Sequence, residues 1–179
     1  MSSNVIIEPL DTDRHDRAAF SSGVEQVDNF LRRTAGRLMK GGTIQVFVMV
    51  DSNDDLARIL GFYSLNAHCV SCGDLPRRYK RFANADGSIS AAFIGMIGVT
   101  QKAQGQGVGR RLLIDALNGA YTVSLRMGTA VVLLDILDCG NPQVVTRRQR
   151  LYEGFGFQAL ASNPLRMFMS MATVAQLQE

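Results

Sequence analysis

Apolar residues recur along the chain with two different spacings, and these spacings predict alternating strands and helices. Short runs rich in β-branched and aromatic residues predict strands over residues 5–7, 43–50, 59–66, 91–99, 130–137 and 166–171. Apolar positions three or four residues apart predict helices over residues 24–38, 107–127 and 145–154. After an initial hairpin the order is strand, helix, strand, helix, strand. We therefore expect an α/β fold with a central mixed sheet flanked by helices.

Length and composition are those of one folded domain. The chain has 179 residues, 46% of them hydrophobic and 20% charged, with no repeat or low-complexity tract, so we expect a single domain over residues 1–179. Its apolar runs are too short to cross a membrane, and its start lacks the basic and apolar regions of a signal peptide. Three cysteines do not make a disulfide framework. These features predict a cytoplasmic protein.

The N-terminal part carries local signals of its own. Ser22 and Glu25 have the spacing of a capping box at the start of a helix. One face of that helix carries Arg32, Arg33 and Arg37, which are either a solvated surface or a contact for a polyanion. His15 lies among charged residues and is expected at the surface.

A glycine-rich segment between a predicted strand and a predicted helix is the first candidate binding site. It reads Gln104-Gly105-Gln106-Gly107-Val108-Gly109-Arg110-Arg111, and a helix start of this kind can bind an anion with its backbone N–H groups. A dinucleotide-binding fingerprint would need glycine at Arg110, and a P-loop would need Lys followed by Ser or Thr. From the glycines alone, a turn without a ligand remains the alternative.

The run from Gly95 to Leu113 resembles the acetyl-CoA signature of the GNAT acetyltransferases, Gln/Arg-x-x-Gly-x-Gly/Ala, which maps onto Gln104, Gly107 and Gly109. The resemblance implies the GNAT acyl-CoA N-acyltransferase fold, acetyl-CoA as acyl donor and no metal. It implies that CoA is bound by Ile97, Gly98, Val99, Gln104, Gly105, Gln106, Gly107, Val108, Gly109, Arg110 and Asn141. The segment 138–143 around Asn141 differs from the short Asp/Ala-rich loop expected there.

A second GNAT hallmark follows downstream. The segment Leu151-Tyr152-Glu153-Gly154-Phe155-Gly156-Phe157 is similar to the family's Tyr-x-x-x-Gly-Phe at the end of a helix. By this resemblance Tyr152 is the general acid that returns a proton to the CoA thiolate. A tyrosine that only packs at a helix end is the alternative. An amine can attack a thioester directly, so no nucleophile on the enzyme is required.

The N-terminal half resembles the GNAT toxins of toxin-antitoxin pairs. The stretch from Phe20 to Leu31 is similar to their Phe-x-x-Gly-x-x-x-Leu-Asp-x-Trp-Leu segment, with Val27 and Phe30 in place of Leu and Trp. The resemblance covers nearly the whole chain. It implies acetylation of the α-amino group of aminoacyl-tRNA, inhibition of translation, a ribbon-helix-helix antitoxin as partner, and a homodimer.

Basic clusters are compatible with a tRNA substrate. The candidate tRNA-binding residues are Arg77, Arg78, Lys80 and Arg81. A further cluster consists of Arg147, Arg148 and Arg150. Each cluster alone is also compatible with a solvated surface.

Other functions remain open from the sequence. An acetyltransferase of this type could act on a protein amine or a small-molecule amine, and a non-catalytic CoA-sensing module could keep the glycine loop. Cys69 and Cys72 have C-x-x-C spacing beside His68, but structural zinc needs four ligands and no second pair exists. Ordinary reduced cysteines are therefore favoured.

Overall fold

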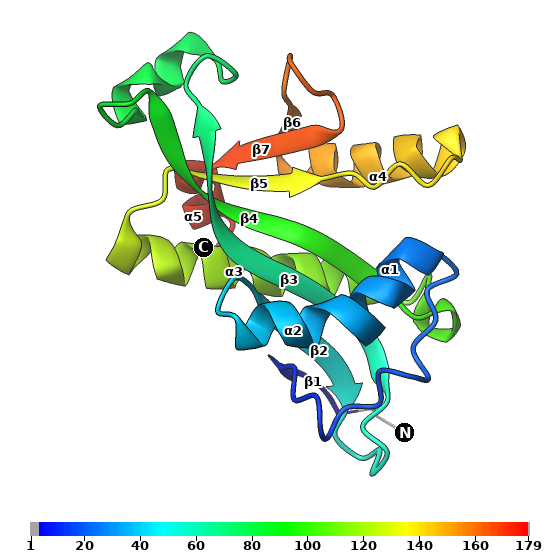
Figure 1. Cartoon of the computed structure of the whole chain (residues 1–179). Coiled ribbons are helices and arrows are strands. Elements are labelled where there is room, and N and C mark those ends of the chain that lie inside the picture. Colours follow the sequence, from blue (N-terminus) through cyan, green and yellow to red (C-terminus); the bar gives the residue numbers. More distant parts are fainter. Residues whose placement is uncertain (1–3, 179) are drawn as a thin grey trace. The chain divides into compact units, whose positions relative to one another are not determined.

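The computed structural model describes residues 4–178, which form two compact units (Figure 1). Each unit combines two stretches of chain, residues 4–66 with 95–116 in unit 1 and residues 67–94 with 117–178 in unit 2. The predicted single domain, residues 1–179, extends beyond the described residues at both ends and stays a prediction. None of the described helices is long and apolar enough to span a membrane.

The strands form a seven-stranded sheet in the order β1-β2-β3-β4-β5-β7-β6. Their bounds are β1 Val5–Pro9, β2 Gln45–Asp51, β3 Ile59–Ser71, β4 Ser88–Val99, β5 Val131–Asp135, β6 Gln158–Ala159 and β7 Arg166–Ser170. β4 and β5 are parallel, whereas the β1–β2, β2–β3, β5–β7 and β6–β7 pairs are antiparallel. The predicted mixed sheet is therefore confirmed.

Each of the three predicted helices, over residues 24–38, 107–127 and 145–154, is present with bounds within a few residues. Their bounds are α1 Glu25–Asn29, the π-helix η1 Phe30–Thr34, α2 Ala35–Lys40, the 3₁₀ helices η2 Arg77–Phe82 and η3 Gln101–Ala103, α3 Val108–Met127, α4 Pro142–Phe155 and α5 Met171–Gln176. The first predicted helix is thus three successive segments. Both η2 and α5 were not predicted.

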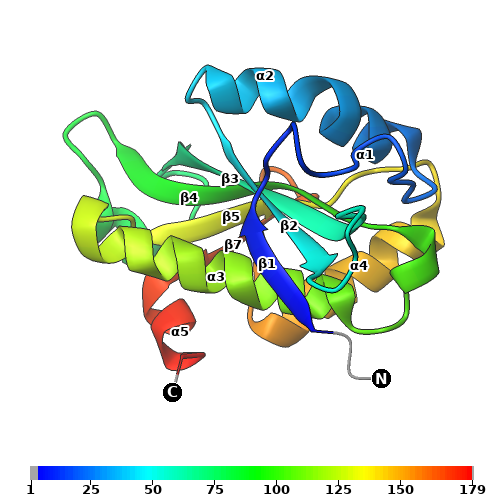
Figure 2. The same ribbon diagram turned by 90° about the horizontal axis from the view of Figure 1, so that it is seen from below.

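In unit 1 the two faces of β3 carry different cores. Gly61 lies so close to α3 that an added Cβ would come within 2.7 Å of the Leu112 side chain. The next residue, Phe62, is fully buried and packs edge-on against Phe20, with ring centroids 5.4 Å apart. Figure 2 shows α1 and α2 on one side of β1–β3 and the start of α3 on the other. Strand alternation therefore places the N-terminal helices and the start of α3 on opposite faces.

In unit 2 a hydrophobic core forms between the strands and the η2 segment. Tyr79 is the only residue of η2 that is buried, and its ring meets Phe168 of β7 edge-on at a centroid distance of 5.6 Å. Val131 and Leu133 of β5 belong to the same buried cluster. Tyr79 therefore anchors an otherwise exposed basic helix to the sheet.

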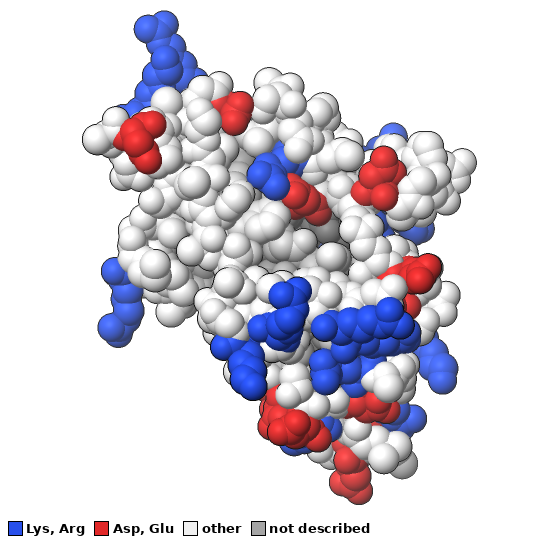
Figure 3. All heavy atoms as spheres, in the orientation of Figure 1, with Lys and Arg blue, Asp and Glu red and all other residues white. Residues whose placement is uncertain are grey.

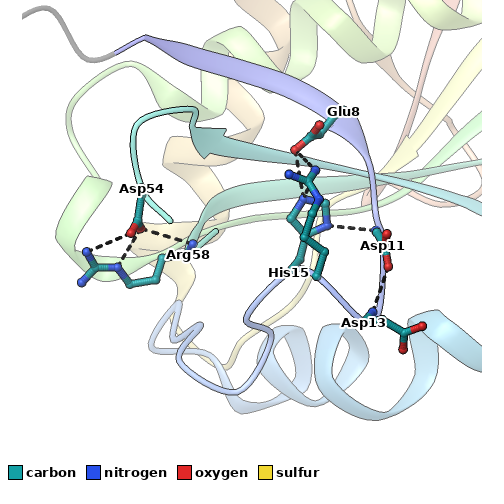
Figure 4. A network of polar contacts seen from close by, with 7 residues as sticks. Glu8, Asp11, Asp13, His15, Asp54 and Arg58 are labelled. Atoms are coloured by element: carbon teal, nitrogen blue, oxygen red, sulfur yellow. Dashed lines mark hydrogen bonds and ion pairs between the residues drawn. The ribbon is translucent and has the colours of Figure 1, made fainter. Parts of the chain in front are cut away.

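His15 was expected at the surface, and this prediction is wrong. Its side chain is fully buried, and the ring lies between Glu8 and the backbone of Asp11 (Figure 4). Nδ1 accepts a hydrogen bond from the Asp11 N–H at 2.9 Å, which leaves Nε2–H to donate to Glu8 at 3.0 Å. The ring can be buried because the Glu8 carboxylate and the Asp11 backbone N–H satisfy both of its nitrogens.

The capping box predicted from Ser22 and Glu25 does not form. Helix α1 begins at Glu25 with Val24 as N-cap, and no side chain caps it. The Ser22 hydroxyl instead donates to the buried carboxylate of Asp28 at 2.7 Å. The hydroxyl also accepts from the Val24 N–H at 3.2 Å, but Val24 is itself the N-cap residue, so no N–H inside the helix is capped.

Candidate functional site

The glycine loop joins the end of β4 to the start of α3 within unit 1. Gly105 and Gly107 both have φ of +78° with open space around them, so backbone conformation and not crowding requires glycine there. Residues 104–107 are exposed. Within the part of the chain that the structure describes, the N–H groups of Gly105, Gln106 and Gly107 meet no backbone acceptor. The loop therefore presents free donors beside a helix N-terminus, the arrangement that binds phosphates.

Gln104 holds this loop in place through its side chain. Its Nε2 donates to the carbonyl oxygen of Ser22 at 2.9 Å and to that of Val99 at 3.0 Å. The signature glutamine is therefore engaged with the protein itself. Its amide ties the loop both to the strand end and to the segment before α1.

The segment before α1 contributes further contacts to the strand end. The carbonyl oxygen of Ser21 accepts from the Gln101 N–H at 2.8 Å and from the Thr100 hydroxyl at 3.2 Å. Gly23 has φ of +84°, and a Cβ there would come within 2.7 Å of the Gln101 side chain. Residues 21–23 thus form an arch over residues 100–104, which we call the arch.

Asp28 secures the arch from inside α1. Its side chain is largely buried, and Oδ1 accepts from both the N–H and the hydroxyl of Ser22, each at 2.7 Å. Hydrogen bonds to a charged acceptor are stronger than neutral ones. A chain of contacts therefore runs from Asp28 through Ser22 to Gln104. Sequence reasoning matched Asp28 to the toxin segment but gave it no role.

The strand residues expected to contact CoA lie at the end of β4. Ile97 and Val99 are partly buried, whereas Gly98 is buried. An added Cβ at Gly98 would come within 2.6 Å of both Phe62 and Val27. Gly98 is thus required by packing, whatever its part in binding CoA.

Gly109 lies in the first turn of α3, and its surroundings differ from those of the other glycines. A Cβ at this position would make an ordinary contact of 3.6 Å with Val99, and its φ is outside the left-handed region. The protein's own packing therefore does not require glycine here. The missing side chain leaves the backbone of this first helical turn open to close approach.

Tyr152 lies in unit 2, near the end of α4. The residue is 9% exposed, and its ring meets Phe157 edge-on with centroids 6.2 Å apart. Burial raises the pKa of the phenol above its ordinary value, and the Arg148 charge opposes that shift. The group therefore keeps its proton at neutral pH, as a general acid must. Among residues 4–178 no partner hydrogen-bonds to this hydroxyl.

Asn141 also lies in unit 2, where it is the N-cap of α4. Its side-chain oxygen accepts from the N–H groups of Gln143 at 3.1 Å and Val144 at 3.4 Å. The local sequence explains this role, because Asn-Pro places a capping side chain directly before Pro142 at N1. The predicted contact of Asn141 with CoA stays a prediction.

The predicted tRNA-binding residues of unit 2 share one short helix. All four cations of η2 are exposed, and Tyr79 anchors the helix between them. The Arg78 guanidinium lies 5.2 Å from the Tyr79 ring centroid, and that of Arg81 lies 4.7 Å from the ring of Phe82. Stacking on rings positions these guanidinium groups without neutralising them.

The second predicted basic cluster lies on α4. Arg147 and Arg150 line a hollow along this helix, whereas Arg148 donates to the carbonyl oxygen of Leu137 at 3.2 Å.

The cysteines of the C-x-x-C segment form no disulfide, and Cys69 is exposed. No group of three or more His, Cys, Asp or Glu side chains suited to a metal occurs among the described residues.

The sequence and the fold have clear relatives. The chain is 48% identical over 172 residues to the probable toxin TacT of Sinorhizobium fredii, which covers 96% of this chain and 94% of that protein. This chain belongs to the TacT family of GNAT acetyltransferase toxins. It is also 27% identical to the tRNA-acetylating toxin of Mycobacterium tuberculosis, over 89% of each chain. No protein-family model matches the sequence.

Solved structures share the fold of this TacT-family chain. AtaT in complex with acetyl-methionyl-tRNAfMet has a TM-score of 0.85 at 22% identity, covering 98% of this chain and 99% of AtaT. A tyrosine-to-phenylalanine mutant of KacT also gives 0.85 at 22% identity, over 97% and 99% of the two chains. A corresponding type of AtaT mutant, bound to acetyl-CoA and the C-terminus of the antitoxin AtaR, gives 0.79 at 21% identity over 98% of each chain. The GNAT fold expected from the sequence is confirmed.

Proposed function

We propose that this TacT-family protein transfers the acetyl group of acetyl-CoA to the α-amino group of aminoacyl-tRNA and thereby blocks translation. The glycine loop with its free N–H groups carries the proposal, because it has the form of a diphosphate site. The relatives supply the acceptor class, since one is a tRNA-acetylating toxin and one structure contains acetyl-methionyl-tRNAfMet.

Acetyl-CoA binds, in this proposal, along the end of β4 and over the glycine loop. The N–H groups of residues 105–109 bind the pyrophosphate, and the backbone of residues 97–99 pairs with the pantetheine arm. The open conformation at Gly107 and the spare room at Gly109 support close approach of the phosphates. Asn141 and Arg110 complete the proposed set of CoA contacts.

The chemistry is direct transfer. The neutral α-amino nitrogen attacks the thioester carbonyl carbon, the C–S bond breaks, and the amine proton leaves to solvent. Tyr152 donates its proton to the departing CoA thiolate, and its raised pKa keeps the phenol protonated until that step. The α-amino group of an aminoacyl ester is weakly basic, so much of it is already neutral at physiological pH.

The remaining parts of the proposal concern partners and location. Arg77, Arg78, Lys80 and Arg81 contact tRNA phosphates. A ribbon-helix-helix antitoxin covers the toxin, in line with the AtaT complexes with AtaR. The protein works as a homodimer in the cytoplasm, where charged tRNA and acetyl-CoA occur. Residues 1–179 act as one domain, since the two units exchange the chain three times.

The test is transfer of labelled acetyl from acetyl-CoA to a bulk pool of charged tRNA by the purified protein. Uncharged tRNA and the Tyr152→Phe variant serve as controls. Label on charged tRNA alone supports the proposal. Absence of label, from protein that binds acetyl-CoA, overturns it and leaves a protein amine, a small-molecule amine or a non-catalytic CoA-sensing role as the alternatives.

A further inference from the structure

Unit 1 contains a basic hollow that the site described above does not use. It lies between η1–α2 and the segment after β1, with a volume of about 1100 Å³. Its lining includes five cations and a single carboxylate, that of Asp11. The five cations, which we call the hollow cations, are Arg17, Arg32, Arg33, Arg37 and Lys40. Figure 3 shows blue side chains gathered over η1 and α2.

The charge of the hollow is not neutralised by the protein. Among the residues that the structure describes, none of the hollow cations has a carboxylate within 4.0 Å. Arg17 donates to the carbonyl oxygen of Arg32 at 3.2 Å, and Arg32 donates to that of Phe20. These contacts fix two guanidinium groups while leaving their charge in place. Asp11 accepts from the Asp13 N–H at 2.9 Å and does not pair with them.

The π-helix affects where Arg32 lies relative to the cations that follow it. Residues 30–34 follow an i→i+5 pattern, in which the Ala35 N–H donates to the carbonyl oxygen of Phe30. In a regular α-helix Arg32 and Arg37 would point about 140° apart, given 3.6 residues per turn. The wider turn brings positions five residues apart closer to one face. Single π-turns occur frequently at functional sites.

We propose that the basic hollow binds the sugar–phosphate backbone of the tRNA substrate. This inference rests on the proposed function and adds a contact surface to it. Four of the five hollow cations are arginines, whose planar forks fit phosphate oxygens in pairs. The hollow offers only Leu10 and Met39 as large apolar lining residues, too few to anchor a peptide side chain by burial. Phosphates therefore suit this surface better than an acidic peptide.

Arg37→Glu is the test variant, since Arg37 is exposed and its side chain makes no hydrogen bond within the described chain. Arg126→Glu is the matched control, with the same change of charge at an exposed position near the end of α3. The KM for charged tRNA is measured between 50 and roughly 200 mM salt. We expect Arg37→Glu to raise that KM about tenfold at unchanged kcat and to lower the salt slope by about one. Acetyl-CoA affinity, measured by calorimetry, stays the same.

Direct binding separates this proposal from the proposed function. Uncharged tRNA is titrated into each variant and followed by fluorescence anisotropy. Weaker tRNA binding by Arg37→Glu than by Arg126→Glu supports the proposal that the hollow binds tRNA, even if the wild type acetylates no tRNA. Equal tRNA binding by the two variants overturns the proposal that the hollow binds tRNA, even if the wild type acetylates charged tRNA. Loss of antitoxin-peptide binding by Arg37→Glu, with unchanged tRNA binding, also overturns it and assigns the hollow to an acidic peptide.

Discussion

The side-chain amide of Gln104 donates to the backbone carbonyl oxygen of Ser22, 82 positions earlier in the chain. Replacing Gln104 by Ala removes this bond and the one to Val99, so the glycine loop loses its tie to the arch. We expect the KM for acetyl-CoA to rise about tenfold, as for the loss of one to two hydrogen bonds, with a smaller effect on kcat. Steady-state kinetics against acetyl-CoA measure this.

Gln26→Ala is a suitable control for that experiment. Gln26 is an exposed residue of α1 whose side chain hydrogen-bonds to no residue in the described chain, and the substitution removes the same amide. An equal rise in KM for both variants would contradict a positioning role for Gln104.

Asp28 is expected to stabilise the arch as well as the fold. Asp28→Ala removes the acceptor of two 2.7 Å hydrogen bonds and leaves Ser22 with buried donors. We expect the free energy of unfolding to fall by about 2–3 kcal/mol. Asp28→Asn keeps one acceptor oxygen and should restore a good part of the loss. Urea unfolding of the three proteins checks both values, and an Ala variant as stable as the wild type would refute the role.

Tyr152→Phe removes one hydroxyl and retains the ring that packs on Phe157. We expect turnover to fall roughly 10²-fold, the usual scale for a lost general acid. Acetyl-CoA affinity and thermal stability should not change. Single-turnover transfer to charged tRNA, beside calorimetry with acetyl-CoA, makes the distinction, and unchanged turnover removes Tyr152 from the mechanism.

Gly109→Ala is expected to change acetyl-CoA affinity without lowering the stability of the fold. Alanine is the better helix former by roughly 1 kcal/mol, and its Cβ meets the protein only at an ordinary 3.6 Å. Stability should therefore stay equal or rise, while acetyl-CoA binds more weakly because the methyl group occupies the phosphates' approach. Gly154→Ala in α4, where the added Cβ meets nothing within 4 Å, should stabilise without weakening acetyl-CoA binding. Unaltered affinity in Gly109→Ala would place the phosphates elsewhere.

The Glu8–His15 pair predicts how stability responds to acid. The hydrogen bond from His15, with a further one from Arg14, lowers the pKa of Glu8 below its ordinary 4.5, while burial opposes this. Below 4.5 the unfolded chain takes up a proton before the folded protein does, so stability falls as pH falls through that range. Glu8→Gln should cost roughly 1 kcal/mol at pH 7. The difference should shrink below the folded pKa, and an equal difference at pH 3 and pH 7 would contradict this account.

The sequence predicted the long elements well because their periodicity reflects burial. Residues 108–127 show this for a helix, and residues 131–135 for a buried strand. The extension of β3 beyond Asn66 was not predictable, because residues 68 and 69 are exposed and follow no apolar alternation. The extension depends on pairing with the neighbouring strand β4, which is distant in the sequence. Just beyond the end of β3, the Cys72 N–H donates to the carbonyl oxygen of Gly87, just before β4.

For the candidate site too, the sequence predicts features with a local pattern and misses features that depend on contacts between distant residues. Gln104 and the glycines could be proposed from the sequence because their spacing is local. Their tie to Ser22 was missed, since a hydrogen bond over 82 positions leaves no local pattern. His15 and Ser22 were assigned wrongly for one shared reason: their partners, Glu8 and Asp28, lie six or seven residues away. Such partners fall outside the spacings that capping and surface rules consider.

The discontinuous units have a consequence for synthesis on the ribosome. The first 66 residues emerge together, but the rest of unit 1 is translated only after the whole of residues 67–94. At 5–20 residues per second, the 50 residues from 67 to 116 take about 2.5–10 s. For most of that delay a nascent chain has the arch without the glycine loop that the arch contacts. The contact between arch and loop therefore forms late, and a chain terminated before residue 104 cannot form it.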